Sequence, residues 1–339
     1  MKIKLPDIHF NSQLLFKEME RRGISVQHLK GTRVLLARFK QHQEWIDDTD
    51  LSVMPAPVRY ILDDKWATKK LLKHLKFPIA EGKIFRWVDI KKAKKYAESR
   101  LPVVLKPVHG SQGKGVRVLL DSVEELEREF FRLSQEWGDE YDFLLERHIF
   151  GGEFRLTVTQ NGFFAAVHRA CPRVVGDGKK TIRQLIEQEN DRRMYPRKNC
   201  LCMIWTDDGE VDRYLAKKGL SLDHVLRKGQ SEYVRANSNV CTGAECIDVT
   251  DLVDPFYKAL AFKILNAIPG LPYCGIDLIT EDISRYDKNT AYTLCEINPA
   301  PGLSLHTHPS SGKSRPLPKA LIDLIFPETA DKVIPNESY

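Results

Sequence analysis

A glycine-rich loop between two short apolar strands is the feature that most constrains the fold of this chain. The segment from Leu101 to Pro107 is apolar and bounded by prolines, which predicts a strand, and Val116–Leu120 reads as a second one. Between them lies the loop Gly110–Gly115. A dinucleotide-binding fingerprint needs its glycines to open a helix, so the strand after this loop excludes that fold. A Walker A loop is also excluded, because Thr307 stands where the first glycine before Gly312-Lys313-Ser314 is required.

The loop has the composition of a phosphate-binding turn. Glycines let the backbone approach a phosphate closely, and successive N–H groups can surround it. Lys106 ends the strand before the loop and Lys65 begins a helix earlier in the chain, so each can place a positive charge nearby. A tight surface hairpin with solvated lysines is the structural alternative that these residues leave open.

Two carboxylates and an amide near the C-terminal end favour a metal site. Glu296 and Asn298 are two residues apart on a predicted strand, so their side chains share a face, and Asp277 lies on the preceding strand. Such oxygen ligands suit Mg²⁺, which would neutralise the charge on bound phosphates. A salt-bridged or solvated strand pair is the alternative.

Composition limits the class of protein. The 339 residues indicate two or three lobes, and the net charge of +6 is too small for the dense basic stripe of a nucleic-acid-binding protein. We see no secretory signal and no apolar run long enough to span a bilayer. The seven cysteines include no CxxC pair, and Cys200-x-Cys202 has no second ligand pair nearby. We therefore expect reduced thiols in a cytoplasmic protein, with no nucleic acid or membrane partner.

Hydrophobic periodicity predicts a mixed α/β (α+β) chain in four parts: 1–57, a small N-terminal region; 58–150, a lobe with the glycine-rich loop; 151–330, a lobe with the metal and substrate site; and 331–339, a tail. The main predicted helices are 12–22, 64–75, 88–100, 122–137, 181–191, 254–266 and 317–326. Ser122 is the predicted N-cap of its helix, with Glu125 three residues on as a capping box. The main predicted strands are 24–29, 33–37, 101–107, 116–120, 142–149, 154–160, 163–169, 275–280 and 291–298. Residues 192–245 carry few clear signals.

Several spaced motifs together resemble the ATP-grasp family. They are Asp64-Lys65, Lys106-Pro107, the loop 110–115, Leu145–Ile149, Gly152–Arg155, Val175–Ile182, Arg235–Asn239, Thr242-Gly243, Asp248–Asp251, Gly275–Asp277, Glu296–Gly302 and the tail from Leu303 to Arg315. The resemblance covers about Val58 to Pro327 and is closest to the ATP-grasp regions of cyanophycin synthetase and of bifunctional glutathione synthetases. It implies two α+β lobes that grip ATP.

The resemblance also implies roles for single residues. The ATP-binding set would be Lys65, Lys106, Gly110, Ser111, Gln112, Gly113, Lys114, Gly115, Glu146, Arg147, His148, Ile149 and Glu153, with 146–149 as the adenine hinge and Glu153 on the ribose. The metal set would be Asp277, Glu296 and Asn298, holding two Mg²⁺ or Mn²⁺ ions. The catalytic set would be Arg155, Arg169, Asn239, Gly302 and Arg315, with the Gly302 N–H offered to a tetrahedral intermediate.

The implied reaction joins an amino-acid or peptide carboxylate to an amine through an acyl phosphate, releasing ADP and phosphate. A small-molecule kinase and a non-catalytic ATP-binding regulatory module are the alternatives, and a homodimer is left open. One departure from the family is Cys241, which stands where the relatives have serine. We interpret it as a small buried substitute, because this mechanism needs no enzyme nucleophile.

Overall fold

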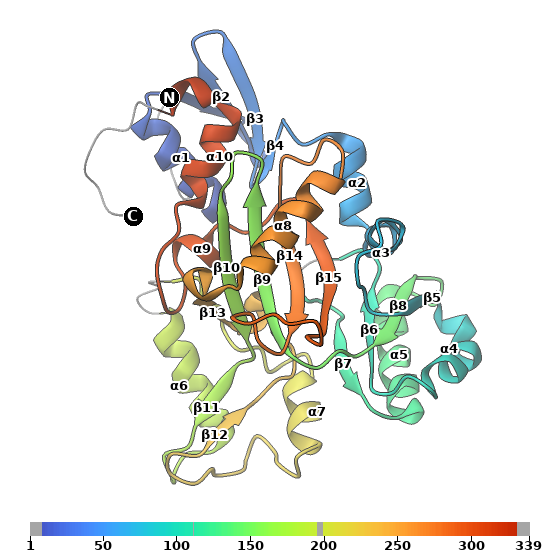
Figure 1. Cartoon of the computed structure of the whole chain (residues 1–339). Helices are drawn as coiled ribbons and strands as arrows, with labels where there is room; N and C mark the ends of the chain where they lie inside the picture. The colour runs from blue at the N-terminus through green and yellow to red at the C-terminus, as the bar shows by residue number, and fades with distance from the viewer. Residues whose placement is uncertain (1–8, 111, 195–198, 331–339) are drawn as a thin grey trace.

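The chain is organised around a five-stranded antiparallel sheet (Figure 1). The computed structural model describes residues 9–110, 112–194 and 199–330. The sheet has the order β13-β10-β9-β14-β15, with β9 (Gly152–Thr159), β10 (Phe164–Ala170), β13 (Glu245–Asp248), β14 (Tyr273–Thr280) and β15 (Tyr292–Asn298). Alternate residues of β9, such as Phe154 and Leu156, enter the core on the face that α8 (Pro255–Ala267) covers. The opposite face is thereby free to carry polar side chains.

A first lobe, residues 82–147, has its own sheet and its own core. Its strands, in the order β5-β8-β6-β7, are β5 (Gly82–Phe85), β6 (Val103–Pro107), β7 (Arg117–Leu120) and β8 (Phe143–Arg147). Helices α4 (Ile90–Ala97) and α5 (Val123–Trp137) complete it, with a 3-10 turn at 87–89. The predicted strand–loop–strand is confirmed, because β6 and β7 pair antiparallel on either side of the glycine-rich loop. The predicted N-cap is confirmed too, since the Ser122 hydroxyl accepts the Glu125 N–H at 3.1 Å.

The N-terminal region shares the core of the central sheet. It contains α1 (Phe10–Arg21), the sheet β1-β2-β3-β4, and the helices α2 (Ala56–Asp63) and α3 (Lys65–His74). The four strands are β1 (Ser25–His28), β2 (Val34–Phe39), β3 (His42–Asp47) and β4 (Asp50–Leu51). Residues such as Leu15, Leu62 and Leu72 belong to one apolar cluster with β9, β14 and α8. The sequence interpretation grouped α2 and α3 with the first lobe, but their buried side chains lie in this larger cluster.

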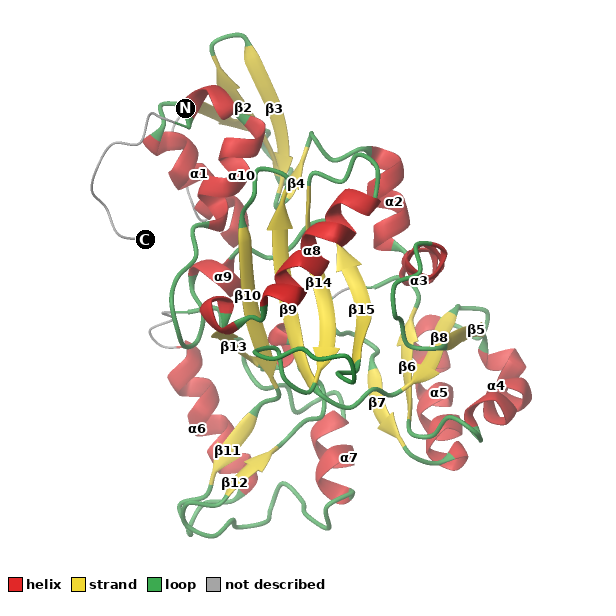
Figure 2. Cartoon of the chain, viewed as in Figure 1, coloured by secondary structure: helices red, strands yellow, loops and turns green. Residues whose placement is uncertain are grey.

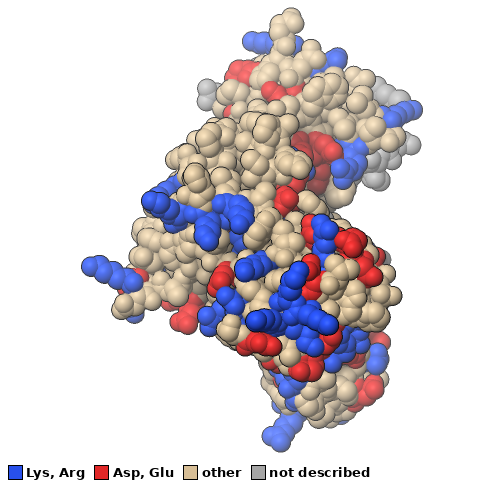
Figure 3. Space-filling view, turned by 90° about the vertical axis from the view of Figure 1, so that its right-hand side faces the viewer, with Lys and Arg blue, Asp and Glu red and all other residues tan. Residues whose placement is uncertain are grey.

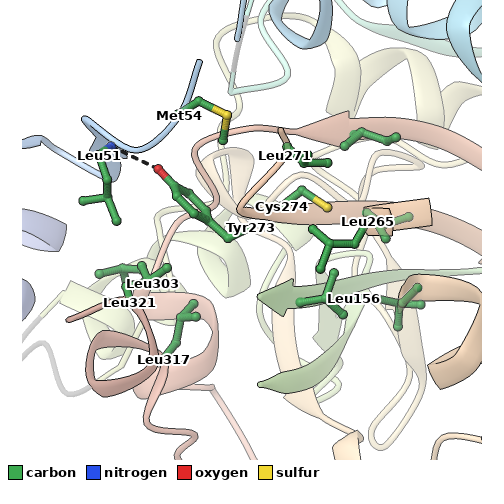
Figure 4. Packing of buried hydrophobic residues seen from close by; sticks show 14 of the residues in the cluster. Leu51, Met54, Leu156, Leu265, Leu271, Tyr273, Cys274, Leu303, Leu317 and Leu321 are labelled. Carbon is green, nitrogen blue, oxygen red and sulfur yellow. Dashed lines mark hydrogen bonds between the residues drawn. The ribbon is translucent and has the colours of Figure 1, made fainter. Parts of the chain in front are cut away.

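A buried tyrosine connects the N-terminal sheet to β14. The Tyr273 hydroxyl accepts the Leu51 N–H at 3.0 Å (Figure 4). It donates to the Thr49 carbonyl at 2.9 Å. Helix α1 also packs against α10 (Leu317–Ile325), as Figure 2 shows, and the buried Arg22 donates to Asp323 at 2.7 Å. The two ends of the described chain are therefore held together by both apolar and ionic contacts.

A small unit at residues 171–235 extends from β10. It contains β11 (Arg173–Val175), α6 (Ile182–Met194), α7 (Glu210–Ala216) and β12 (Ser231–Tyr233), around buried residues such as Ile186 and Leu215. The predicted helix at 181–191 is confirmed as α6. Helix α7 was missed, because it has only seven residues and no capping side chain. The remaining elements are α9 (Ser304–Thr307) and 3-10 turns at 240–242, 250–252 and 327–329. Within the described residues, every helix is too short or too polar to span a bilayer.

The joint between the first lobe and α7 is ionic. Arg213 of α7 donates to Glu125 at 2.9 Å, to Glu210 at 2.8 Å and to the Val118 carbonyl at 2.6 Å. Lys217 donates to Glu125 at 2.7 Å. The side chains of Glu125, Glu210 and Arg213 are all more than nine-tenths buried. Elsewhere on the first lobe, acidic and basic side chains are interleaved at the surface (Figure 3).

We predict that Arg213→Ala lowers the free energy of unfolding by about 2–3 kcal/mol, because it removes the cation that two buried carboxylates share and leaves Glu125 with Lys217 and Glu210 with Arg117. Urea unfolding followed by circular dichroism measures this. The matched control is Arg183→Ala, whose partner Asp223 is 3.5 Å away with both side chains at least half exposed. That change should cost about 0–1 kcal/mol. Equal losses in the two variants would show that the α7 cluster does not stabilise the fold.

Candidate active site

A row of charged side chains crosses the polar face of the central sheet. In the strand register, Asp277 of β14 lies opposite Glu296 of β15 on one side and opposite Arg155 of β9 on the other. Glu153, two residues before Arg155, lies opposite Arg169 of β10. Residues directly opposite in an antiparallel pair share a face, so these five side chains lie together. The predicted placement of Glu296 and Asp277 on facing strands is confirmed.

Asp277 is the most strongly paired member of the row. It is 4% exposed and accepts hydrogen bonds from Arg155 and, at 2.8 Å, from Arg169. Burial alone would raise the pKa of this carboxyl, but the two guanidinium groups more than offset it and hold the pKa below its ordinary value. Asp277 is therefore ionised. Its ion pairs with Arg155 and Arg169 occupy most of its acceptor capacity.

Gly275 makes room for this pairing. A Cβ atom there would lie 2.8 Å from Nη1 of Arg155 and 3.0 Å from the side chain of Pro301. Any side chain at this position would displace the guanidinium from Asp277.

Glu296 retains more acceptor capacity than Asp277. Its side chain is 31% exposed, and its nearest cation is Nζ of Lys65, at 3.9 Å. The side-chain amide oxygen of Asn298 accepts the Ala300 N–H at 3.1 Å, which leaves that oxygen a second lone pair. Among the described residues no group of three or more His, Cys, Asp and Glu side chains forms a complete metal cage. The donors instead fit Mg²⁺, which commonly binds one or two carboxylates and completes its shell with phosphate oxygens and water.

Lysines from two elements surround one buried glutamate. Glu146 of β8 lies 2.5 Å from Nζ of Lys106 and 2.9 Å from Nζ of Lys69. Burial alone would lower the pKa of Lys106, but the carboxylate of Glu146 raises it above the ordinary value, so Lys106 stays charged. Sequence reasoning missed Lys69. Its spacing of four residues from Lys65 on α3 is the signal that could have found it.

The glycine-rich loop lies against both lobes. Lys65 donates to the Gly110 carbonyl at 2.6 Å, and a Cβ on Gly113 would lie 2.9 Å from the Asn239 side chain. Gly113 also has φ of +73°, which favours glycine. The Lys114 ammonium is 3.4 Å from Glu136 at the surface of α5. Gln112 and Gly115 have φ of +59° and +72°, and Ser111 lies outside the described residues.

Trp137 and Tyr141 lie against the glycine-rich loop. A Cβ on Gly115 would lie 3.3 Å from the Trp137 ring nitrogen, and the Tyr141 hydroxyl donates to the His109 carbonyl at 2.7 Å. The Trp137 side chain therefore limits the size of the residue that the loop can carry at position 115.

The segment between the lobes contains the predicted hinge. Arg147 is exposed, while His148 and Ile149 are partly buried. The backbone N–H of Arg147 donates to the Glu81 carbonyl at 3.1 Å, and that of His148 donates to the Pro102 carbonyl at 2.9 Å. Glu153, which follows this segment, accepts hydrogen bonds from Arg169 and from Ser238.

Arg315 and Arg169, two of the predicted catalytic residues, differ in their surroundings. Arg315 donates to Asp248 at 2.6 Å and to Asp251 at 3.0 Å, so its guanidinium connects the C-terminal tail to β13 and does not join the row. Arg169, in contrast, keeps a buried Nε without a partner among the described residues. A ligand oxygen could accept that hydrogen bond.

His306 is a second residue that sequence reasoning missed. It is fully buried, its Nε2 lies 2.8 Å from the Thr157 hydroxyl, and Thr157 is two residues beyond Arg155 on β9. Burial, with a smaller contribution from the Arg155 charge, lowers its pKa to about 3. His306 is therefore a neutral imidazole near the arginines. A histidine in a tail with one other, His308, gives no sequence signal for this.

Comparison with known proteins agrees with the fold. The chain is 31% identical over 327 residues to cyanophycin synthetase of Crocosphaera subtropica, covering 96% of this chain and 37% of that protein. It is 28% identical over 335 residues to a glutathione biosynthesis bifunctional protein of Streptococcus mutans, covering 96% of this chain and 44% of that protein. The crystal structure of a bifunctional glutathione synthetase from Pasteurella multocida matches with a TM-score of 0.64 and 26% identity, covering 95% of this chain and 44% of that one. No family model matches.

These findings, together with the fold, define the class: the chain belongs to the ATP-grasp ligase family. Within it, about 96% of the chain is homologous to the ATP-grasp region of the cyanophycin synthetases and glutathione biosynthesis bifunctional proteins. The chain spans less than half the length of these relatives. The predicted family and fold class are confirmed.

We predict that Lys106→Ala weakens ATP binding at least about tenfold, because the family resemblance assigns this buried charge to an ATP phosphate. Titration calorimetry measures the affinity, and circular dichroism checks the fold. The control is Lys91→Ala on α4, an exposed lysine of the same lobe, which should leave ATP affinity unchanged. Unchanged affinity in a folded Lys106→Ala protein would remove this lysine from the nucleotide site.

We predict a pH dependence of stability that His306 causes. The unfolded state takes up the proton near pH 6.5 while the folded state resists it down to about 3, so stability is full above pH 6.5 and falls as the pH drops through this window. Between pH 7 and 5 the wild-type protein should lose about 2 kcal/mol more than His306→Gln does. Urea unfolding at both pH values measures the difference. The exposed His224→Gln control should follow the wild type, and parallel losses in all three proteins would contradict the assignment.

Proposed function

We propose that the chain is an ATP-dependent carboxylate–amine ligase that joins an amino-acid-like carboxylate to an amine through an acyl phosphate and releases ADP and phosphate. One observation carries the proposal. The ammonium of Lys65 touches the glycine-rich loop at the Gly110 carbonyl and lies 3.9 Å from Glu296 on the central sheet. A phosphate chain between the glycine-rich loop and Glu296 would have cations such as Lys65 on one side. It would have the metal-binding oxygens of the central sheet on the other.

The chemistry requires this concentration of charge. An acid and an amine at neutral pH form a salt, and hydroxide is too poor a leaving group for direct condensation. Transfer of the γ-phosphoryl group to the carboxylate converts that oxygen into part of a phosphate leaving group. Both reactants are negative, so cations must lower their repulsion. Lys65, Lys106 and Arg169 supply protein charges, and the partnerless Nε of Arg169 suits an acid or phosphoryl oxygen.

Magnesium would supply the remaining positive charge at Glu296, Asn298 and Asp277, where the donor set fits it. Glu296 would provide the main ligand, because Asp277 is already paired with two arginines. Once the acyl phosphate forms, the amine attacks its carbonyl carbon, phosphate leaves with the original carboxylate oxygen, and the amine loses a proton. The loop 110–115 would exclude water from this intermediate.

The relatives support the choice of substrate class. Their names describe cyanophycin synthesis and glutathione biosynthesis. We therefore expect both substrates to be amino-acid-like, with ATP and two Mg²⁺ ions as the other components. The likeness does not name either substrate.

An oxygen-label experiment tests the reaction type. ADP release is first screened against pairs of amino acids, and the active acid is then labelled with ¹⁸O in its carboxylate. One label should appear in the released phosphate, and hydroxylamine should replace the amine to give a hydroxamate. Phosphate without label, or AMP and pyrophosphate as products, would contradict the proposal. ADP release that needs no amine and gives a stable phosphorylated product would identify a kinase, and no turnover at all would favour a binding module.

The same assay tests the metal ligand. Glu296→Gln should lower turnover about a hundredfold or more, because it removes the negative charge that would hold magnesium against the phosphates. The matched control is Glu281→Gln, an exposed glutamate in the turn after β14, which should behave as wild type.

A further inference from the structure

The turn after β15 presents a single uncommitted backbone donor. Residues 299–303 read Pro-Ala-Pro-Gly-Leu, and the prolines at 299 and 301 have no N–H. The Ala300 N–H donates to Asn298 at 3.1 Å and the Leu303 N–H donates to Asn11 at 3.0 Å. No described residue accepts a hydrogen bond from the Gly302 N–H. The turn therefore isolates one donor, next to the residues assigned to magnesium.

The glycine at 302 is not explained by the protein's own packing. Its φ lies outside the positive range, and an added Cβ would find its nearest neighbour, Leu305, 3.9 Å away. An alanine there would meet neither backbone strain nor a clash within the protein. The absence of a side chain is instead suited to close approach by a ligand to this backbone.

Asn11, near the start of α1, fixes the far end of the turn. Its side-chain nitrogen donates to Asp48 at 3.3 Å, which orients the amide so that its oxygen faces the Leu303 N–H. The Leu303 carbonyl accepts the N–H groups of His306 and Thr307, each at 3.0 Å, so both polar backbone groups of Leu303 are held. Phe10, one residue before Asn11, packs edge-on against His308 with ring centroids 5.9 Å apart.

Helix α1 is a firm support for this contact. Arg22, just beyond its end, donates to Glu18 at 2.6 Å and to Asp323 of α10 at 2.7 Å. Leu14, Leu15 and Met19 are buried in the main core. Asn11 therefore connects a helix fixed to the body of the protein with the turn that carries Gly302.

We propose that Asn11 is a positioning residue that aims the Gly302 N–H at the oxygen of the reacting acyl group. This rests on the proposed ligase function. Negative charge develops on that oxygen when the amine attacks, and a donor stabilises it only when its position is set in advance. A displacement of about 1 Å is enough to lose most of the effect. Helix α1 thus contributes to turnover through the turn that it holds.

Exchanging the side chains of Asn11 and Asp48 provides the test. Asn11→Ala should reduce turnover at saturating substrates about tenfold or more while ATP affinity stays within about twofold, because the donor is misplaced and not removed. Asn11→Asp alone places a carboxylate beside Asp48 and should also be impaired. Adding Asp48→Asn restores a donor for residue 11, and residue 48, with φ of +57°, tolerates asparagine well. The double variant should recover most of the turnover.

The matched control is Asn161→Ala, which removes a similar hydrogen bond, from the Asn161 amide to the Ala320 carbonyl at 2.8 Å, away from the turn. Its turnover should equal wild type. Equal loss in Asn161→Ala and Asn11→Ala, or no recovery in the double variant, would overturn the proposal, because either result indicates a general loss of structure.

Hydrogen exchange separates this proposal from the ligase assignment. In the full chain, the peptide containing Leu303 should exchange faster in Asn11→Ala than in wild type and return to the wild-type rate in the double variant, while β14 is unchanged. Unchanged exchange around Leu303 would overturn the role of Asn11 whether or not a substrate pair is found. Altered exchange with normal turnover would overturn it as well. Absence of wild-type turnover with every acid and amine would instead refute the ligase, and with it the proposed role of Asn11.

Discussion

The ion pairs of Asp277 with Arg155 and Arg169 are the interaction on which the rest of the site depends. A buried carboxylate such as Asp277 is stable only if cations compensate for its lost hydration. The antiparallel register of β9, β14 and β15 supplies that compensation, because it places an arginine opposite an aspartate. A slip of one residue in β9 would send Arg155 into the core and expose Leu156. The apolar face of the sheet therefore fixes the geometry of the polar one.

The parts of the molecule differ in how they share its apolar cores. The first lobe and the 171–235 unit each have an apolar cluster, whereas the N-terminal region shares that of the central sheet. The contacts of α7 with the first lobe are largely ionic, through Arg213 and Lys217. Charged side chains can return to water at lower cost than apolar ones. The ionic contacts of α7 with the first lobe therefore differ from the largely apolar contacts of α1 with the main core. The contact that positions the turn at Gly302 comes from Asn11 of α1, a helix that is packed into the main core.

Local signals predicted much of this structure. Ser122 was recognised as a helix cap because capping depends on residues only three apart, and β14 and β15 were predicted from alternation and from the charged turn between them. Strand β3 was missed because its sequence, HQEWID, is mostly polar, whereas β4 and α7 are too short for periodicity to show. Lys69 and His306 were missed for another reason. Their meaning depends on Glu146 and Thr157, which are distant in sequence and become neighbours only after folding.

The sequence by itself determined the strand–loop–strand that carries the glycines, the two-residue spacing of Glu296 and Asn298, and the prolines that remove donors on either side of Ala300. These are local properties of backbone chemistry and side-chain periodicity. Only the tertiary structure decided that Arg155 and Arg169 both pair with Asp277, that Arg315 is held by Asp248 and Asp251, and that Asn11 reaches Leu303. A guanidinium or an amide can satisfy its hydrogen bonds with many partners, and the choice among them depends on which elements the packing of the core brings together.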